Sequence, residues 1–130
     1  MANNEIQPQK VRPLAAKLIF AALKVLKDNG GEMRGKQVIE EVEKRVPLGE
    51  WERQRYEKTG NIRWRSVLHF YTIDLIKAGF LIKKKGVWFL TPEGETALKL
   101  GETGLLDAAT KAYREWRQKE SKARGVAASR

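Results

Sequence analysis

The chain has 130 residues, a formal net charge of +10, a sequence pI near 10.0 and no cysteine. This length fits one domain with tails, and the missing cysteines exclude disulfides, thiolate metal sites and a thiol nucleophile. Because no apolar run approaches the roughly 20 residues of a membrane-spanning helix and no signal peptide opens the chain, we expect a soluble, cytoplasmic protein with no membrane partner.

The positive charge is concentrated in the middle of the chain. Residues 61–90 hold 6 Lys or Arg against 1 acid, whereas residues 1–60 hold 12 against 9. A clustered excess of basic residues is typical of proteins that bind nucleic acids. The middle of the chain is therefore the first place to look for contacts with DNA phosphates.

The first third predicts two helices behind a flexible tail. Residues 1–12 are polar and are expected to be flexible. A helix over 13–28 has a broad apolar face and ends at Asn29-Gly30-Gly31, residues that tolerate left-handed backbone. Residues 32–34 fit a short strand or a turn, and a second helix fits 35–45.

The charged segment 48–58 is longer than the turn that a recognition helix needs before it. We interpret it as an insertion that contains a helical turn or two and braces the next helix through Trp51 and Tyr56. Its basic side chains are secondary candidates for contacts with the DNA backbone: Arg53, Arg55 and Lys58.

A long third helix is predicted over 62–78, closed by Gly79. Helical spacing places six mostly apolar residues on its core face: Trp64, Val67, Leu68, Tyr71, Leu75 and Ala78. The same spacing places another six on the opposite side: Arg63, Ser66, His69, Phe70, Ile73 and Lys77. Two large apolar side chains, Phe70 and Ile73, are unusual on a solvated face, so a neighbouring element or a partner should cover them.

A β-hairpin follows, with strands over 80–84 and 87–90 joined by Lys85-Gly86. We expect the strand Val87-Trp88-Phe89-Leu90 to pack the hairpin on the core. Alternation places Trp88 and Leu90 on one face and Val87 and Phe89 on the other, so one of the two aromatic side chains can stay exposed. Thr91 is a good N-cap and Pro92 suits the first position of the next helix.

The trailing part predicts a helix over 92–100, a break over 101–104 and a last helix over 105–122, followed by a flexible tail over 123–130. The last helix has an apolar stripe made of Leu105, Ala109, Ala112 and Trp116. This stripe is compatible with packing on the domain itself or with a homodimer through the C-terminal helix.

This order of elements predicts an α+β fold, a winged helix-turn-helix over 13–100 followed by the C-terminal helix over 101–122. In that fold the third helix lies in the major groove of double-stranded DNA and the hairpin, or wing, rests on the flanking backbone. Asn61, Arg63, Arg65 and Ser66 cluster at the start of the third helix, where side chains reach base edges. Arg63 and Ser66 are the better groove candidates by angle, since Arg65 flanks the core stripe.

The remaining candidates complete a DNA-binding set without catalytic chemistry. His69, Phe70, Ile73 and Lys77 continue the outer face of the helix, and the wing tip adds Lys83, Lys84 and Lys85 for phosphate contacts. We expect no catalytic residue, metal or cofactor, because the single histidine has only Asp74 near it in sequence and no enzyme motif is present.

Four short motifs stand in order along the chain: Tyr56-Glu-Lys-Thr-Gly60, Leu68-His-Phe-Tyr71, Lys77-Ala-Gly-Phe80 and Gly86-Val-Trp-Phe-Leu-Thr-Pro-Glu-Gly94. Through these motifs the chain resembles, over about residues 14–100, the N-terminal domain of the Mrr family of modification-dependent restriction endonucleases. The resemblance implies a winged-helix DNA-binding module of a restriction or defence system that acts on methylated or otherwise modified DNA, and a nuclease domain or subunit as partner. Two other readings stay open, a stand-alone transcription regulator and a winged helix that binds proteins only.

Overall fold

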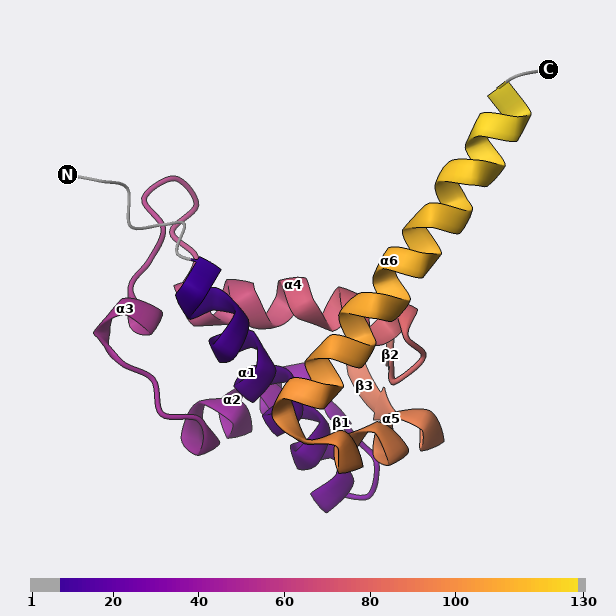
Figure 1. The fold of residues 1–130 in the computed structure, drawn as a ribbon. Coiled ribbons are helices and arrows are strands. Elements are labelled where there is room, and N and C mark those ends of the chain that lie inside the picture. Colours follow the sequence, from indigo (N-terminus) through magenta and orange to yellow (C-terminus); the bar gives the residue numbers. More distant parts are fainter. Residues whose placement is uncertain (1–7, 129–130) are drawn as a thin grey trace.

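The computed structural model describes residues 8–128, with side chains for residues 11–123, and places a small sheet at one edge of a helical body (Figure 1). Its helices are α1 (Pro8–Asp28), α2 (Gly35–Arg45), α3 (Glu50–Arg53), α4 (Arg63–Lys77), α5 (Pro92–Ala97), the 3-10 helix η1 (Leu98–Leu100) and α6 (Gly101–Ala128). Its strands are β1 (Glu32–Arg34), β2 (Leu81–Lys84) and β3 (Val87–Leu90). The predicted α+β winged helix-turn-helix is confirmed in its element order, including the exact bounds of α2.

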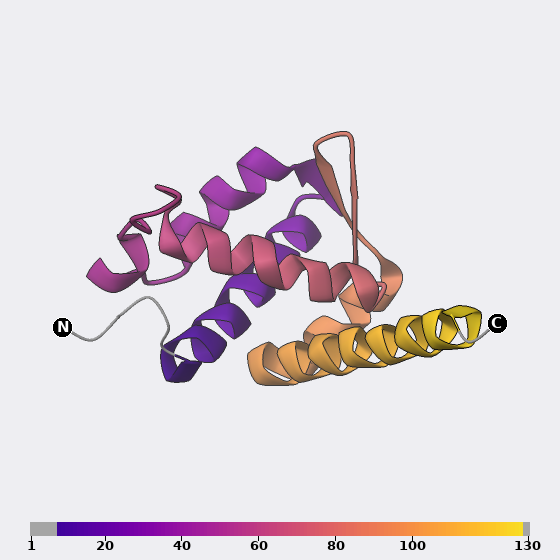
Figure 2. The ribbon, with the colours of Figure 1, turned by 90° about the horizontal axis from the view of Figure 1, so that it is seen from above.

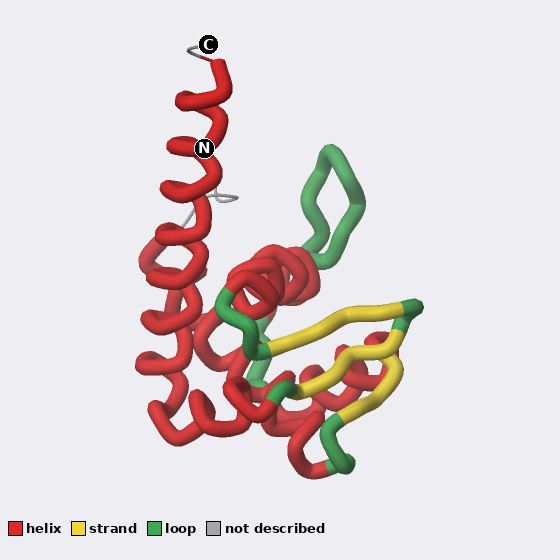
Figure 3. The backbone as a smooth tube through the Cα atoms, turned by 90° about the vertical axis from the view of Figure 1, so that its right-hand side faces the viewer, coloured by secondary structure: helices red, strands yellow, loops and turns green. Residues whose placement is uncertain are grey.

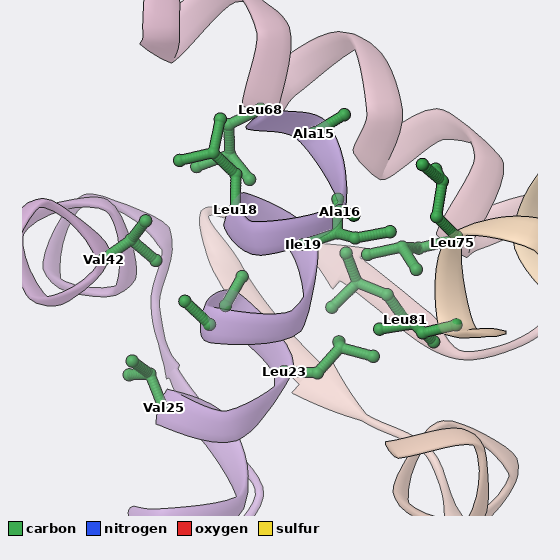
Figure 4. Close-up of a cluster of buried hydrophobic side chains, with 14 of the residues drawn as sticks. Ala15, Ala16, Leu18, Ile19, Leu23, Val25, Val42, Leu68, Leu75 and Leu81 are labelled. Atoms are coloured by element: carbon green, nitrogen blue, oxygen red, sulfur yellow. The ribbon is translucent and has the colours of Figure 1, made fainter. Parts of the chain in front are cut away.

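Helix α1 lies at the centre of the core. Leu18, Ile19 and Leu23 are fully buried, and Figure 4 shows their side chains directed toward neighbours from several elements. Helix α4 crosses over α1 and presents Leu68 and Leu75 to it (Figures 2 and 4). Burying a leucine of this kind contributes about 1.5–3 kcal/mol, so the position of α4 is fixed chiefly by its inner face.

The sheet has the strand order β1-β3-β2, with antiparallel pairing throughout. Trp88 of β3 pairs with Lys83 on one side and Met33 on the other. Trp88 is buried and Leu90 is half-buried against the core, so the hairpin packs on the core as predicted, and Phe89 on the other face is half-buried. The turn residues Lys85 and Gly86 have φ of 52° and 81°, the pattern of a type I′ turn, in which both central residues need positive φ.

The predicted start of α5 is also confirmed. Thr91 Oγ1 accepts a hydrogen bond from Gly94 N at 2.9 Å and donates one to Gly79 O at 2.6 Å. Pro92 takes the first helical position. The cap therefore joins the end of the hairpin to the end of α4, because Gly79 follows Ala78, the C-cap residue of that helix.

The predicted end of the first helix at residue 28 is confirmed, but its predicted start and the predicted limits of the last helix were wrong. Helix α1 begins at Pro8 rather than Pro13, so Pro8 takes the first helical position that suits proline; residues 1–7 of the expected tail lie outside the described residues. Helix α6 runs through the expected break and through most of the expected 123–130 tail, to Ala128. Only Gly101 has a positive φ there, whereas Gly104 is helical and its missing Cβ leaves room for Leu100.

The first part of α6 belongs to the core of this chain. Leu105 and Ala109 are fully buried against the body, where α6 packs on α1 and α4. Of the two alternatives for the predicted stripe, its first half, Leu105 and Ala109, therefore packs on the domain itself. The rest of α6 projects away from the body (Figure 1).

Candidate nucleic-acid interface

The outer face of α4 is open between two flanking structures. Seen from above and along α4, the hairpin lies on one side of the helix and α6 on the other (Figures 2 and 3). Phe70 and Ile73 on this face are 62% and 43% exposed. No element among the described residues covers them, so the expectation of a covering neighbour is not met and the partner alternative stays a prediction.

Two adjoining cavities lie along the N-terminal half of this face. The first, of about 420 Å³, is an open hollow between the start of α2, α4 and the wing, with Lys36, Glu40 and Trp88 in its lining. The second, of about 470 Å³, lies toward the insertion and is lined by Arg55, Asn61, Ile62 and Ser66. Arg65 and His69 line both cavities and therefore occupy the middle of the concave surface.

The expected position of Arg63 on the outer face was wrong. Its side chain is only 4% exposed, with the guanidinium carbon 4.5 Å from the centre of the Trp51 ring and 5.3 Å from that of Tyr56. Its Nη1 donates to Trp51 O and Gln54 Oε1, both at 3.3 Å, and its Nε is buried without a hydrogen-bond partner. The aromatic residues of the insertion fold over this side of the helix and stack on the cation, so Arg63 holds the insertion to α4.

The insertion ends in a projecting loop that carries Arg55 and Asn61 to the outer face of α4 (Figure 3). An isolated antiparallel bridge pairs Arg55 with Ile62, and Tyr56 N donates to Asn61 O at 2.9 Å. The Arg55 Nη1 donates to Gly60 O at 2.6 Å. These contacts close the loop on itself, which fixes Arg55 beside the second cavity.

Lys36 was not predicted as a site residue. It lies in the first turn of α2, which reaches the wing because Gly35 N donates to Gly86 O at 2.9 Å and β1 pairs with β3. A Cβ on Gly35 would lie 2.3 Å from Trp88 Nε1, so only glycine permits this approach. The sequence contains no local signal for this contact, since it depends on strand pairing across more than fifty residues.

The three lysines of the wing have different environments. Lys83 Nζ donates to Thr72 Oγ1 of α4 at 2.8 Å and lies 4.4 Å from the centre of the Trp88 ring. Burial accordingly lowers the pKa of Lys83. Lys84 and Lys85 are exposed, and neither has an ion pair with another described side chain. Lys83 thus connects the wing to α4, while Lys84 and Lys85 are free to meet a ligand.

His69 lies on the wing side of α4, with its ring 6.3 Å from the Trp88 ring in an edge-on arrangement. Burial lowers the pKa of His69, and the nearby charges of Lys83 and Arg65 lower it further. Asp74, five residues on, is buried on another side of α4, where burial raises the pKa of its carboxyl and Arg12 acts in the opposite direction. The two side chains therefore do not form an acid–base pair.

The C-terminal half of the face is linked to α6. Lys77 Nζ lies 3.8 Å from the centre of the Trp116 ring, and the rings of Tyr113 and Trp116 are 5.8 Å apart. Lys77 is exposed, but its ammonium group already lies on an aromatic ring. It is therefore less available to a ligand than the ammonium groups of Lys84 and Lys85 at the wing tip.

The described residues 8–128 show no metal centre and no membrane-spanning helix. They contain no group of three or more His, Cys, Asp or Glu side chains arranged to hold a metal ion. They also contain no helix with the length and apolar character needed to cross a membrane. The arrangement offers cationic and hydrogen-bonding side chains on a concave surface, which suits an extended anionic ligand.

Comparison of the chain with known proteins identifies its family. A family model described as the Mrr N-terminal domain matches residues 16–100. No curated protein and no solved structure matches the chain. Since the model matches more than half of the chain, including both cavities and the wing, this protein belongs to the Mrr N-terminal domain family.

Proposed function

We propose that this protein binds double-stranded DNA through the outer face of α4, with the wing on the flanking phosphates. One observation carries the proposal: the two cavities that meet at Arg65 and His69 each have a further cationic side chain in their lining, Lys36 in the first and Arg55 in the second. Arginine can pair with guanine through two hydrogen bonds in the major groove, and lysines on a wing contact phosphates without regard to sequence. Arg65, rather than Arg63, is the proposed base-reading arginine.

The decisive test compares free lysines at the wing with free lysines elsewhere. Replacing Lys84 and Lys85 by Ala should lower affinity for every duplex and flatten the plot of log K against log salt by about 1.8, or ~0.9 per lost phosphate contact. The control replaces the exposed Lys27, near the end of α1, and Lys99 of η1, neither of which belongs to α4 or the wing. Equal slopes for the two variants would contradict the proposed position of the DNA.

The exposed pair Phe70 and Ile73 supports a finer proposal, the reading of methylated or otherwise modified bases in an Mrr-type restriction system. Apolar side chains contact the C5-methyl group of a pyrimidine in the major groove. A 5-methylcytosine duplex should bind about tenfold more tightly than the same unmodified sequence, which corresponds to about 1.4 kcal/mol. Phe70→Ala with Ile73→Ala should abolish this preference and leave the salt slope unchanged, whereas equal binding of both duplexes by the natural protein would refute it.

We also propose that DNA cleavage belongs to another domain or subunit and not to residues 16–100. The family match supports this division, because it is a match to an N-terminal domain only. Incubating the chain with modified plasmid and Mg²⁺ should leave the plasmid supercoiled. Nicked or linear product that persists on further purification would overturn the proposal.

A second candidate function, binding of a protein partner, is favoured by a single observation. Large apolar side chains remain exposed along α4 and β2, namely Phe70, Ile73, Ile76 and Ile82. If this surface binds protein alone, the natural chain will fail to shift any duplex in a gel at moderate salt. Salt-sensitive DNA binding that needs Lys84 and Lys85 would exclude that reading.

A further inference from the structure

Helix α6 consists of two parts with opposite charge. Residues 101–110 contain two acids and no Lys or Arg, whereas residues 111–128, the distal arm, contain six Lys or Arg and two acids. The first part packs on the body, and the distal arm projects from it (Figure 1). A basic segment that leaves the body is not needed for the core, so its charge calls for another explanation.

The basic side chains that the structure describes in the distal arm, all within residues 111–122, have no ion pair with another described side chain. Lys111, Arg114, Arg117, Lys119 and Lys122 are all exposed. Five free cations on a rigid element attract a polyanion far more strongly than they attract a neutral protein surface.

The direction of the distal arm is fixed relative to the outer face of α4. Trp116 lies under Lys77 at 3.8 Å and beside Tyr113 at 5.8 Å, so the base of the arm is attached to the C-terminal end of α4. The arm leaves along one side of α4 while the wing occupies the other (Figures 2 and 3). A duplex that contacts the outer face of α4 must therefore lie beside the arm.

We infer that the distal arm is an additional DNA-contacting element, which binds backbone phosphates on the side of α4 opposite to the wing. At 1.5 Å per residue the arm is about 27 Å long, more than the ~12 Å width of the major groove, so it reaches phosphates beyond the groove that α4 occupies. This inference rests on the proposed DNA binding and extends it to a part of the chain outside residues 16–100.

The test uses the full chain and a duplex of at least two turns. Arg117→Gln with Lys122→Gln removes two arm cations and keeps good helix formers, and the control Lys27→Gln with Lys99→Gln removes two cations from α1 and η1. Binding is followed by fluorescence anisotropy over a range of KCl. The arm variant should lose about 1.8 from the salt slope, and the control should match the natural protein.

The alternative outcomes separate the two proposals. If the natural chain binds no duplex, the proposed function fails and this inference fails with it. If binding depends on Lys84 and Lys85 but the arm variant keeps the full slope, only this inference is overturned. A dimer in sedimentation velocity that dissociates in the arm variant, with an unchanged salt slope, would overturn it too, because the arm would then bind a second copy of the chain.

Discussion

Replacing Arg63 by Met should change stability little, whereas replacing it by Ala should be strongly destabilising. Arg63→Met removes two hydrogen bonds of 3.3 Å, a loss of about 1–2 kcal/mol, and two cation–π contacts, a loss of about 1–2 kcal/mol. It also removes the buried Nε without a partner, a gain of about 1–3 kcal/mol. The net loss is therefore about 1 kcal/mol, within a range from a gain of about 1 kcal/mol to a loss of about 3 kcal/mol. Arg63→Ala also empties the space between Trp51 and Tyr56, which adds about 2–3 kcal/mol.

The assay is urea unfolding followed by tryptophan fluorescence, combined with the salt slope of DNA binding. Arg63→Met should keep the salt slope of the natural protein, because a side chain that is 4% exposed makes no phosphate contact. The matched control is Arg65→Met, an exposed change that should alter stability by less than about 0.5 kcal/mol and weaken DNA binding. A slope that falls by ~0.9 in Arg63→Met, with unfolding unchanged, would refute the buried position of Arg63.

Three further outcomes are expected. Lys83→Met should lower the free energy of unfolding by about 1–2 kcal/mol without altering the salt slope of DNA binding, because Lys83 is hydrogen-bonded to α4. Lys84→Met should flatten the salt slope and leave the free energy of unfolding unchanged. Urea unfolding measures the first quantity and fluorescence anisotropy the second. Since the pKa of His69 is held below 6.5 by burial, Lys83 and Arg65, bound phosphate should raise it, so affinity should increase as pH falls from about 7.5 to 5.5 and His69→Gln should remove this dependence. Lys85→Asn should raise the free energy of unfolding by about 1 kcal/mol, because Lys85 has a φ of 52° that asparagine tolerates better, and it should weaken DNA binding. An unchanged free energy of unfolding would contradict the turn geometry.

Features with local signals could be predicted from the sequence. The hairpin, the Thr91 cap and the limits of α2 depend on a few neighbouring residues, and the structure confirms each of them. The environment of Arg63 could not be predicted, because helical spacing gives its angle on α4 but does not show which side the insertion covers. The different role of Lys83 has the same origin, since its partner Thr72 lies on another element.

The predicted start of α1 and the predicted limits of α6 were wrong for a related reason. The predicted boundaries fall at a proline and at a glycine, yet Pro13 lies inside α1 and Gly104 inside α6. Tertiary packing overrides such signals when an apolar stripe continues across them. In α6 the buried Leu105 and Leu106 directly follow Gly104, and their burial favours the continuous helix.

Helix α4 is attached at both ends by a cation lying on aromatic rings, Arg63 with Trp51 and Tyr56 at its start and Lys77 with Trp116 at its end. Its conformational entropy is therefore lost when the chain folds and not when a ligand arrives, which is the basis of preorganised binding. A surface of this kind forms a complex without a coupled folding step, so the heat-capacity change of binding should reflect only the area that the ligand covers. The side chains along the outer face of α4 therefore have fixed spacings before a ligand arrives. A ligand binds only if its own groups have matching spacings, because the helix does not rearrange to fit it.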